Sequence, residues 1–368
     1  MNIFIVGYEH PKTDKRVFRT VSSLAQKAEN KIIYQYWTDN INEKRQTQGS
    51  ITYCPVFYDK NSSVSALYKL KRRKAFDNII MDMILHEDYD VIIFNYFVIS
   101  YLTKAFSAAK KRNKKIIYDI HELHPENFLN LMTGFKAKLK QAILWKALKK
   151  QLKLSDKVVY VSHEIKEEII FKTKVEKAFL IVPNYASVKL DPDPKKKIKD
   201  ILYVGGVKRS LEQERKLISF FQNEGYTFTI LGMKYKMDME KVLYEEYKPY
   251  GEMMHRINQS RFSLVAYQTS GRKDYKNDLY ALPHKFYDSV AAGTPVIIKK
   301  EFVSMAKLVE KYQIGVVADT SDIQKTALAI HQAEENYPAL MENIRKFQDE
   351  FVWTDAKQKE YIDFITQL

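Results

Sequence analysis

Cysteine, glycine and long apolar runs are all scarce in this chain of 368 residues. Cys54 is the only cysteine, so no internal disulfide can form, and we expect a reducing, cytoplasmic environment. Cysteines and histidines are not clustered at the short spacings of a structural zinc site, which excludes that class of fold. The longest uncharged apolar run, 91–103, is too short to span a bilayer. The first residues carry no basic leader and are expected to form a β-strand instead of a signal peptide.

Positive charge is what the chain has in excess. The net charge is +15 at pH 7, and nearly all of it lies in the first 190 residues. Within the basic stretch 104–157, a helix predicted over 135–153 carries seven lysines and Trp145. Its apolar residues form two arcs: Phe135, Leu139, Ile143 and Ala147, and then Leu144, Leu148 and Leu152.

One arc of this helix can pack on the domain while the other stays beside the lysines. Tryptophan, leucine and lysine together favour an anionic membrane surface, so peripheral contact with the inner face of a membrane is one interpretation. A helix buried on two sides, with solvated lysines, is the alternative. No nucleic-acid-binding motif is present, so we expect no nucleic acid partner.

Short apolar runs alternate with longer amphipathic segments in both halves of the chain. Strands are predicted at 2–7, 31–37, 91–95, 115–119, 157–161 and 179–183, and then at 200–204, 226–231, 261–267, 295–299 and 315–318. Buried strands separated by helical lengths predict parallel sheets covered on both faces. Near Asp191 the prolines and lysines of DPDPKKKIKD interrupt the pattern and favour an exposed connection.

The predicted fold is therefore α/β, with two Rossmann-like doubly wound domains facing a central cleft. The first domain is expected over 1–185, a linker over 186–200, and the second domain over 201–352. A terminal helix, 353–368, is expected to complete the first domain.

The segment LPHKFYDSVAAGTPV, Leu282–Val296, has the form of a phosphate site. Pro283 ends a loop and a helix begins near His284, so backbone N–H groups and Lys285 can hold an anion there. Asp288 lies one turn further on the same face and can reach a hydroxylated group attached to that phosphate. A helix that starts at proline, ends at glycine and carries a surface lysine is the plain alternative.

Polar residues follow an apolar strand in IIYDIHELHPE, Ile116–Glu126. Asp119, His121, Glu122 and His124 thus fall at a strand's carboxyl end, where ligands of open α/β sheets bind. A sugar or acceptor site, a structural loop and a metal site are all compatible with this pattern. The histidines are not spaced for one face of a helix, which argues against the metal.

A third segment, ILYVGGVKRSLE, runs from a strand into Gly205-Gly206 and then Lys208-Arg209 before a helix. Glycines let the backbone approach an anion, and the basic pair can neutralise it. The pattern is not a P-loop, because no G-x-x-x-x-G-K-[ST] occurs.

In this order and spacing, the segments resemble the retaining glycosyltransferases of family 4, which have the GT-B fold. The resemblance covers nearly the whole chain and is most specific in P-x-K-x-x-(acid)-x-x-A-x-G-x-P-V. Asp288 stands where glutamate is usual, and Tyr280 stands where the family has the first acid of E-x7-E. DKRVFRTVSSLAQ resembles the family's first helix, with Gly7 and Arg16 facing the cleft.

The resemblance implies transfer of a sugar from a nucleotide-diphosphate donor to a lipid-linked or cell-surface glycan. Lys208, Arg209 and Lys285 would stabilise the departing diphosphate, and Asp288 would hold the ribose. His121 would contact the reacting sugar. The remaining site residues that it implies are Gly205, Gly206, Pro283 and His284 for the donor, and Gly7, Arg16, Asp119 and Glu122 for the cleft and acceptor.

No cofactor beyond the nucleotide-sugar co-substrate is expected. The D-x-D tripeptides at 88–90 and 191–193 do not follow a buried strand, so no metal is expected either. A non-catalytic nucleotide-sugar- or glycan-binding relative would explain Tyr280. A sugar-nucleotide epimerase of the same fold is the other alternative.

Overall fold

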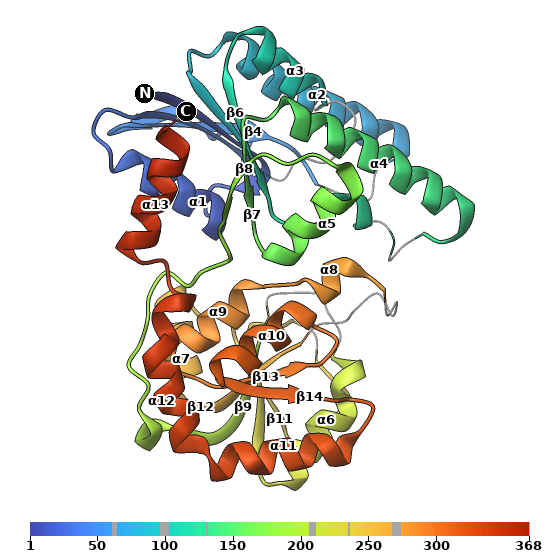
Figure 1. Cartoon of the computed structure of the whole chain (residues 1–368), viewed down its shortest axis with the longest axis vertical. Helices are drawn as coiled ribbons and strands as arrows, with labels where there is room; N and C mark the ends of the chain where they lie inside the picture. Colours follow the sequence, from blue (N-terminus) through green and yellow to red (C-terminus); the bar gives the residue numbers. More distant parts are fainter. Residues whose placement is uncertain are drawn as a thin grey trace. The chain divides into compact units, whose positions relative to one another are not determined.

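The computed structural model describes residues 1–60, 65–95, 103–127, 129, 132–205, 211–234, 236–266 and 274–367. The chain forms two compact units, each with its own sheet (Figure 1). The N-terminal unit consists of Met1–Phe128 and Met132–Val182 and is completed by Ala356–Leu368. The C-terminal unit is formed mainly by Pro183–Asp355.

The sheet of the N-terminal unit has eight strands in the order β3-β4-β2-β1-β5-β6-β7-β8. All neighbouring pairs are parallel except β3 with β4. The strands are β1 (Asn2–Pro11), β2 (Lys31–Thr38), β3 (Gln46–Gln48), β4 (Ile51–Phe57), β5 (Val91–Asn95), β6 (Lys115–Ile120), β7 (Lys157–Tyr160) and β8 (Ala178–Ile181). After β4 the chain returns to the other side of β1, so the order reverses between β1 and β5.

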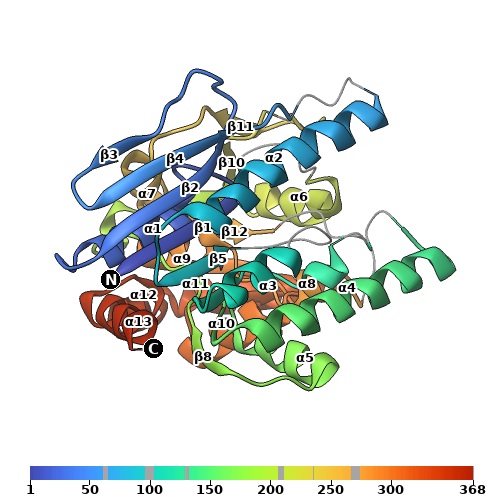
Figure 2. The same ribbon diagram turned by 90° about the horizontal axis from the view of Figure 1, so that it is seen from above.

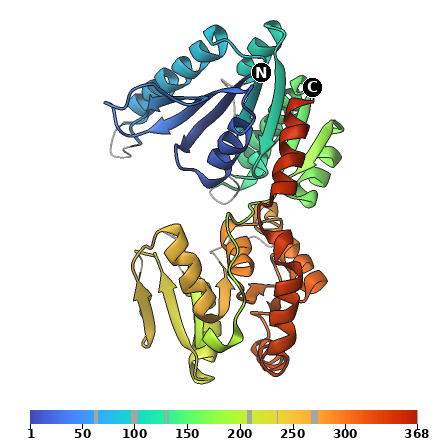
Figure 3. The same cartoon turned by 90° about the vertical axis from the view of Figure 1, so that its left-hand side faces the viewer.

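This reversal distributes the helices over the two faces, because parallel crossovers are right-handed. On one face α1 (Lys15–Ala25) is joined by the terminal helix α13 (Asp355–Thr366), the red helix beside the C-terminus in Figure 3. The Tyr361 hydroxyl of α13 donates to Thr20 Oγ1 of α1 at 3.2 Å. On the other face four helices lie side by side (Figure 2): α2 (Ala66–His86), α3 (Thr103–Lys111), α4 (Gly134–Leu154) and α5 (His163–Thr173). The short 3-10 helix η1 (His124–Glu126) follows β6.

The sheet of the C-terminal unit has six strands, all parallel, in the order β11-β10-β9-β12-β13-β14. The strands are β9 (Ile198–Val204), β10 (Thr227–Leu231), β11 (Val242–Glu245), β12 (Ser260–Val265), β13 (Val296–Lys299) and β14 (Gly315–Ala318). Here the order reverses between β9 and β12. In open α/β sheets, ligands bind at the carboxyl ends of the strands beside such a reversal.

Helices cover both faces of this second sheet. α6 (Arg215–Asn223) contacts α11 (Ile323–Glu335), and α7 (Tyr250–Gln259) contacts α9 (His284–Ala291). The other helices of the unit are α8 (Lys276–Leu279), α10 (Val303–Tyr312), α12 (Tyr337–Phe347), η2 (Pro194–Lys196), η3 (Glu212–Glu214) and η4 (Gln348–Phe351).

The prediction of an α/β fold with two doubly wound units is confirmed. Three strands were not predicted, namely β3, β4 and β11. In β4 the apolar run is broken by Pro55, which is tolerated because β3 pairs only with Ile51–Tyr53 and leaves Pro55 at an edge. β11 is a four-residue edge strand in which only Val242 is buried, and its apolar run of three residues is too short to stand out in the sequence.

The segment 186–200, expected as an exposed connection, is attached to the C-terminal unit at several points. Ala186 pairs with Val352, and Lys197 Nζ donates to the Gly293 carbonyl at 2.8 Å. A Cβ atom on Gly293 would lie 2.8 Å from Pro192 Cα, so glycine is required for that approach. Many side chains of the segment are nevertheless exposed, which explains its polar composition.

Candidate functional site

Lys285 lies at the reversal point of the C-terminal sheet. It is in the first turn of α9, and its Nζ donates to the Tyr203 hydroxyl at 3.0 Å and to the Ala266 carbonyl at 2.6 Å. Tyr203 is near the carboxyl end of β9, and Ala266 directly follows β12. The ammonium group therefore lies between the ends of the two strands at which the order reverses, where ligands of this architecture bind.

The Tyr203 ring supports this lysine from one side. Lys285 Nζ lies 4.2 Å from the centre of the ring, within the range of a cation–π interaction. A Cβ atom on Gly205 would lie 2.4 Å from Cε1 of the same ring. Gly205 thus makes room for Tyr203, in addition to the predicted approach of backbone to an anion. Gly206, Lys208 and Arg209 lie outside the described residues.

Asp288, one turn after Lys285, is a buried carboxylate with 4% exposure. Its Oδ1 accepts a hydrogen bond from the Tyr250 hydroxyl at 2.8 Å, and that hydroxyl accepts from the Ser187 N–H at 3.0 Å. Burial, and next the Asp288 charge, raise the pKa of Tyr250 above its usual value, so the phenol stays protonated and donates. Tyr250 was missed because it lies on α7, far from Asp288 in the sequence.

The remaining predicted donor residues surround the start of α9. Pro283 is its N-cap residue, and His284 is its first residue. Pro283 offers no side-chain acceptor to the first backbone N–H groups of the helix. Tyr280, at the position of the absent acid, is the C-cap residue of α8, and its N–H donates to the Lys276 carbonyl at 2.9 Å.

In the N-terminal unit, Arg16 and Asp119 form a buried ion pair with each other. Arg16 Nε and Nη2 donate to the two carboxylate oxygens at 3.1 and 2.6 Å, and the side chains are 3% and 2% exposed. Arg16 Nη1 also donates to the Val182 carbonyl. Burial alone would raise the pKa of Asp119, but Arg16 and then His121 outweigh it and hold that pKa well below its usual value. The pair ties the first turn of α1 to the carboxyl end of β6.

His121 lies directly beyond this pair. Its Nε2 is 3.4 Å from Asp119 Oδ2, and its side chain is 14% exposed. Burial lowers the pKa of His121 to about 4 in spite of the Asp119 charge. The imidazole is therefore neutral at pH 7, a form suited to hydrogen bonds with uncharged hydroxyl groups.

A second histidine, which sequence reasoning missed, accompanies His121. The rings of His10 and His121 have centres 5.1 Å apart. His10 Nδ1 lies 2.9 Å from Asp14 Oδ2, and Asp14 also caps α1 by accepting from the Arg16 and Val17 N–H groups. The end of the first strand carries polar residues just as the end of β6 does, and that common signal could have identified His10.

Two other predicted residues have partners within the fold. Glu122 Oε1 accepts from Asn127 Nδ2 at 2.6 Å. A Cβ atom on Gly7 would lie 2.7 Å from the Gln35 carbonyl oxygen, so this glycine serves the close approach of β2. Within the described ranges, no three His, Cys, Asp or Glu side chains gather as metal ligands would.

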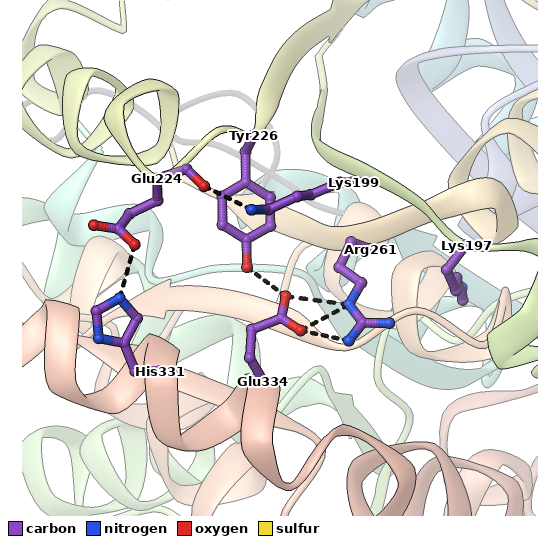
Figure 4. A pocket seen from close by; sticks show the side chains of 7 residues that line it. All are labelled: Lys197, Lys199, Glu224, Tyr226, Arg261, His331 and Glu334. Atoms are coloured by element: carbon purple, nitrogen blue, oxygen red, sulfur yellow. Dashed lines mark hydrogen bonds and ion pairs between the residues drawn. The ribbon is translucent and has the colours of Figure 1, made fainter.

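A cavity of about 390 Å³ opens at the opposite end of the C-terminal sheet. Its lining residues are Lys197, Lys199, Glu224, Tyr226, Arg261, His331 and Glu334 (Figure 4). Its charged groups largely satisfy one another, since Glu334 accepts from both Arg261 and Tyr226, and Glu224 from His331. Arg261 is at the start of β12, so this cavity is remote from the carboxyl ends where Lys285 lies.

Two family models together match most of the chain. One, described as Glycosyltransferase Family 4, matches residues 38–185. The other, described as Glucosyltransferase 3-like, C-terminal domain, matches residues 201–353. No curated protein sequence matches the chain significantly.

Solved structures resemble the chain over its full length at low sequence identity. Sucrose-phosphate synthase from Thermosynechococcus elongatus has a TM-score of 0.71 and 12% identity, covering 100% of this chain and 98% of its own. The E. coli trehalose-6-phosphate structure bound with UDP-2-fluoro glucose has a TM-score of 0.66 and 13% identity, covering 100% and 99%. WaaG, a glycosyltransferase involved in lipopolysaccharide biosynthesis, has a TM-score of 0.63 and 13% identity, covering 100% of both chains. At such identities these similarities establish the fold.

Proposed function

Because this chain is a family 4-like glycosyltransferase with the GT-B fold, we propose that it transfers a sugar from a nucleotide-diphosphate donor with retention at the anomeric carbon. The observation that carries the proposal is the position of Lys285 between the carboxyl ends of β9 and β12. The acceptor in this proposal is a lipid-linked or cell-surface glycan. WaaG, whose fold is similar, is involved in lipopolysaccharide biosynthesis.

In the proposed reaction, the bond between the sugar and the diphosphate breaks and negative charge develops on the leaving phosphate. Lys285, with Lys208 and Arg209, stabilises that charge, which is the largest contribution such a site can make. Asp288 holds the ribose hydroxyls. The acceptor oxygen forms the new bond to the anomeric carbon, and its proton passes to the leaving phosphate, so the proposal needs no separate base. Because the basic residues neutralise the diphosphate, the proposal needs no metal ion.

The N-terminal unit binds the acceptor in this proposal, and the neutral His121 donates or accepts a hydrogen bond at a sugar hydroxyl. Arg16 and Asp119 act through their mutual ion pair, which fixes the end of the strand that carries His121. Gly7 and Glu122 have similar supporting roles, since Gly7 allows the close approach of β2 and Glu122 accepts a hydrogen bond from Asn127.

Nucleotide binding is the first test. In a thermal-shift panel of UDP, GDP, ADP, CDP, dTDP and their sugars, we expect one nucleotide family to raise the melting temperature. A ligand present at about 100 times its Kd stabilises the folded state by about 2.7 kcal/mol. Inorganic phosphate at the same concentration is the control. If no nucleotide raises the melting temperature above that control, the proposed donor site is wrong.

Activity assays on the nucleotide sugar that binds separate the alternatives. Conversion of the free nucleotide sugar without an acceptor would identify an epimerase. Binding with no turnover on any glycan or lipid-linked acceptor would identify a non-catalytic relative, which the tyrosine at 280 also allows.

We also propose that the N-terminal unit contacts an anionic membrane surface through α4. On this helix Phe135, Leu139 and Ile143 are 80%, 53% and 55% exposed, while Leu144 and Leu148 are buried. One apolar arc thus packs on the unit and the other lies among lysines at the surface. No helix in the described part of the chain combines the length and apolarity needed to cross a bilayer.

The neighbouring layer of helices extends this surface. At the start of α2, Leu67, Tyr68 and Leu70 are 81%, 52% and 67% exposed, and they alternate with Lys69 and Lys71. Both α2 and α4 contact α3, and Figure 2 shows the three helices side by side. Apolar side chains can enter the headgroup region while each lysine gains about 1 kcal/mol beside anionic lipid.

Vesicle binding tests this contact. The variant Phe135→Ser/Ile143→Ser should bind vesicles of phosphatidylglycerol and phosphatidylcholine at least about tenfold more weakly, since burying such a side chain contributes about 1.5–3 kcal/mol. Leu328→Ser, at a leucine of α11 that is 62% exposed, is the matched control and should bind normally. Cosedimentation measures both. Equal binding of wild type and the double variant, or no preference for anionic lipid, would contradict the proposal.

A further inference from the structure

A second lysine lies at the carboxyl ends of the strands of the C-terminal sheet, as Lys285 does, and it is paired with a fully buried glutamate. Lys299 is the last residue of β13 and is 5% exposed. Its Nζ donates to Glu214 Oε1 at 2.9 Å. Glu214 ends η3, immediately before α6, and is 0% exposed.

The strand register brings this pair close to Lys285. Val265 of β12 pairs with Ile298 of β13, so the next residues, Ala266 and Lys299, leave the sheet at the same level. Lys285 Nζ donates to the Ala266 carbonyl. Two ammonium groups and one carboxylate therefore gather at the carboxyl ends of adjacent strands.

The carboxylate interacts with both lysines. Burial raises the pKa of Glu214, and the charges of Lys299 and then of Lys285 act against that rise. Glu214 Oε2 is buried and accepts no hydrogen bond from any described residue. That oxygen is an acceptor that the Lys285 ammonium could occupy if Lys299 were removed. A buried charge without a partner is costly, so such an exchange would be strongly favoured.

We propose that Glu214 and Lys299 are positioning residues of the donor site, and that together they set the charge which Lys285 presents to the donor diphosphate. Glu214 keeps the two ammonium groups from repelling each other. Lys299 occupies Glu214 and so prevents this carboxylate from neutralising Lys285. The inference rests on the proposed function, because it takes the ligand of Lys285 to be a nucleoside diphosphate.

The two members of the pair act on Lys285 in opposite directions, and this gives a sharp test. Removing the charge of Glu214 leaves Lys285 beside a like charge, which favours its deprotonation. Removing Lys299 leaves Lys285 beside an unshared carboxylate, which favours its protonation. Nucleotide binding is expected to weaken at alkaline pH, where Lys285 loses its proton. We call this part of the pH profile the alkaline limb. The two substitutions should displace it in opposite directions.

The experiment measures the Kd of the full chain for the tightest of UDP, GDP, ADP, CDP and dTDP between pH 7 and 11. Glu214→Gln should move the alkaline limb to lower pH, and Lys299→Met should move it to higher pH. Both variants should bind about tenfold more weakly than wild type at pH 7.5, a loss of about 1.4 kcal/mol, because each changes the charge that Lys285 carries at the donor site. Lys285→Arg should remove the contribution of residue 285 to this alkaline fall in binding, because arginine keeps its charge throughout, and should leave only the contribution of Lys208.

A purely structural pair would behave differently, since both substitutions would lower the melting temperature and move the limb alike or leave it in place. That result would overturn the inference. Where Lys299→Met melts too low to assay, Lys299→Gln gives the same comparison, and Glu214→Gln/Lys299→Met should return the limb to its wild-type position. If wild type binds none of the nucleotides, the proposed function has failed and not this inference alone.

Discussion

Replacing Lys285 with alanine is expected to lower the rate of sugar transfer by about 100- to 1,000-fold, the loss typical of removing one preorganised group from a developing negative charge. The ammonium group is held at its position by Tyr203 and by the Ala266 carbonyl, so it requires little reorganisation when the donor binds. Alanine removes the charge and leaves the helix intact, since it is the best helix former. Initial rates of release of the nucleoside diphosphate measure the effect.

Substitution of an exposed lysine elsewhere is the control that distinguishes this loss of activity from an effect of the protein's net charge. Lys325 lies on α11 with 74% of its side chain exposed, and Lys325→Ala should transfer sugar at the wild-type rate. Lys285→Arg should retain more activity than alanine, because it restores the charge with a different geometry. Transfer by Lys285→Ala at the wild-type rate would show that the phosphate site lies elsewhere.

The second large effect concerns stability. Asp119→Asn or Arg16→Leu should lower the free energy of unfolding by about 3–5 kcal/mol, because either change leaves a buried charge without its partner. Both side chains are almost wholly buried, so water cannot screen the charge that remains. Urea-induced unfolding of the full chain, followed by circular dichroism, measures the change.

The double variant Arg16→Leu/Asp119→Leu should recover much of this stability, since replacing a whole buried ion pair by apolar residues is often close to neutral. Removing the exposed pair of Arg345 and Glu342, which are 47% and 68% exposed, is the control and should change stability by less than about 1 kcal/mol. A loss of similar size at both sites would mean that burial of the Arg16–Asp119 pair has no special role.

The sequence predicted most of the elements because their signal is local. β5 and β14 were predicted with the bounds that the structure gives, since each is a short run of apolar residues between polar ones. β4 and β11 were missed although both contain apolar residues, because Pro55 interrupts β4 and β11 is only four residues long. Their pairing partners, β2 and β10, decide that they become strands.

The candidate site likewise contains residues that the sequence identified and residues that only the structure shows. Lys285 and Asp288 were identified because α9 brings them onto one face within a few residues of each other. Tyr203 and Tyr250, which contact them, lie 82 and 38 positions away in the sequence. Only strand order and helix packing bring such distant residues together.

The sequence by itself therefore determined the two doubly wound units, the start of α9 with Lys285 in its first turn, and the polar residues at the end of β6. It could do so because periodicity, helix starts and strand ends are properties of neighbouring residues. The tertiary structure decided which groups these side chains meet: Tyr203 and Ala266 for Lys285, Tyr250 for Asp288, and each other for Arg16 and Asp119. Such contacts depend on the order of strands in a sheet and on burial, and burial is what sets the charge of His121 and raises the cost of an unpaired Asp119.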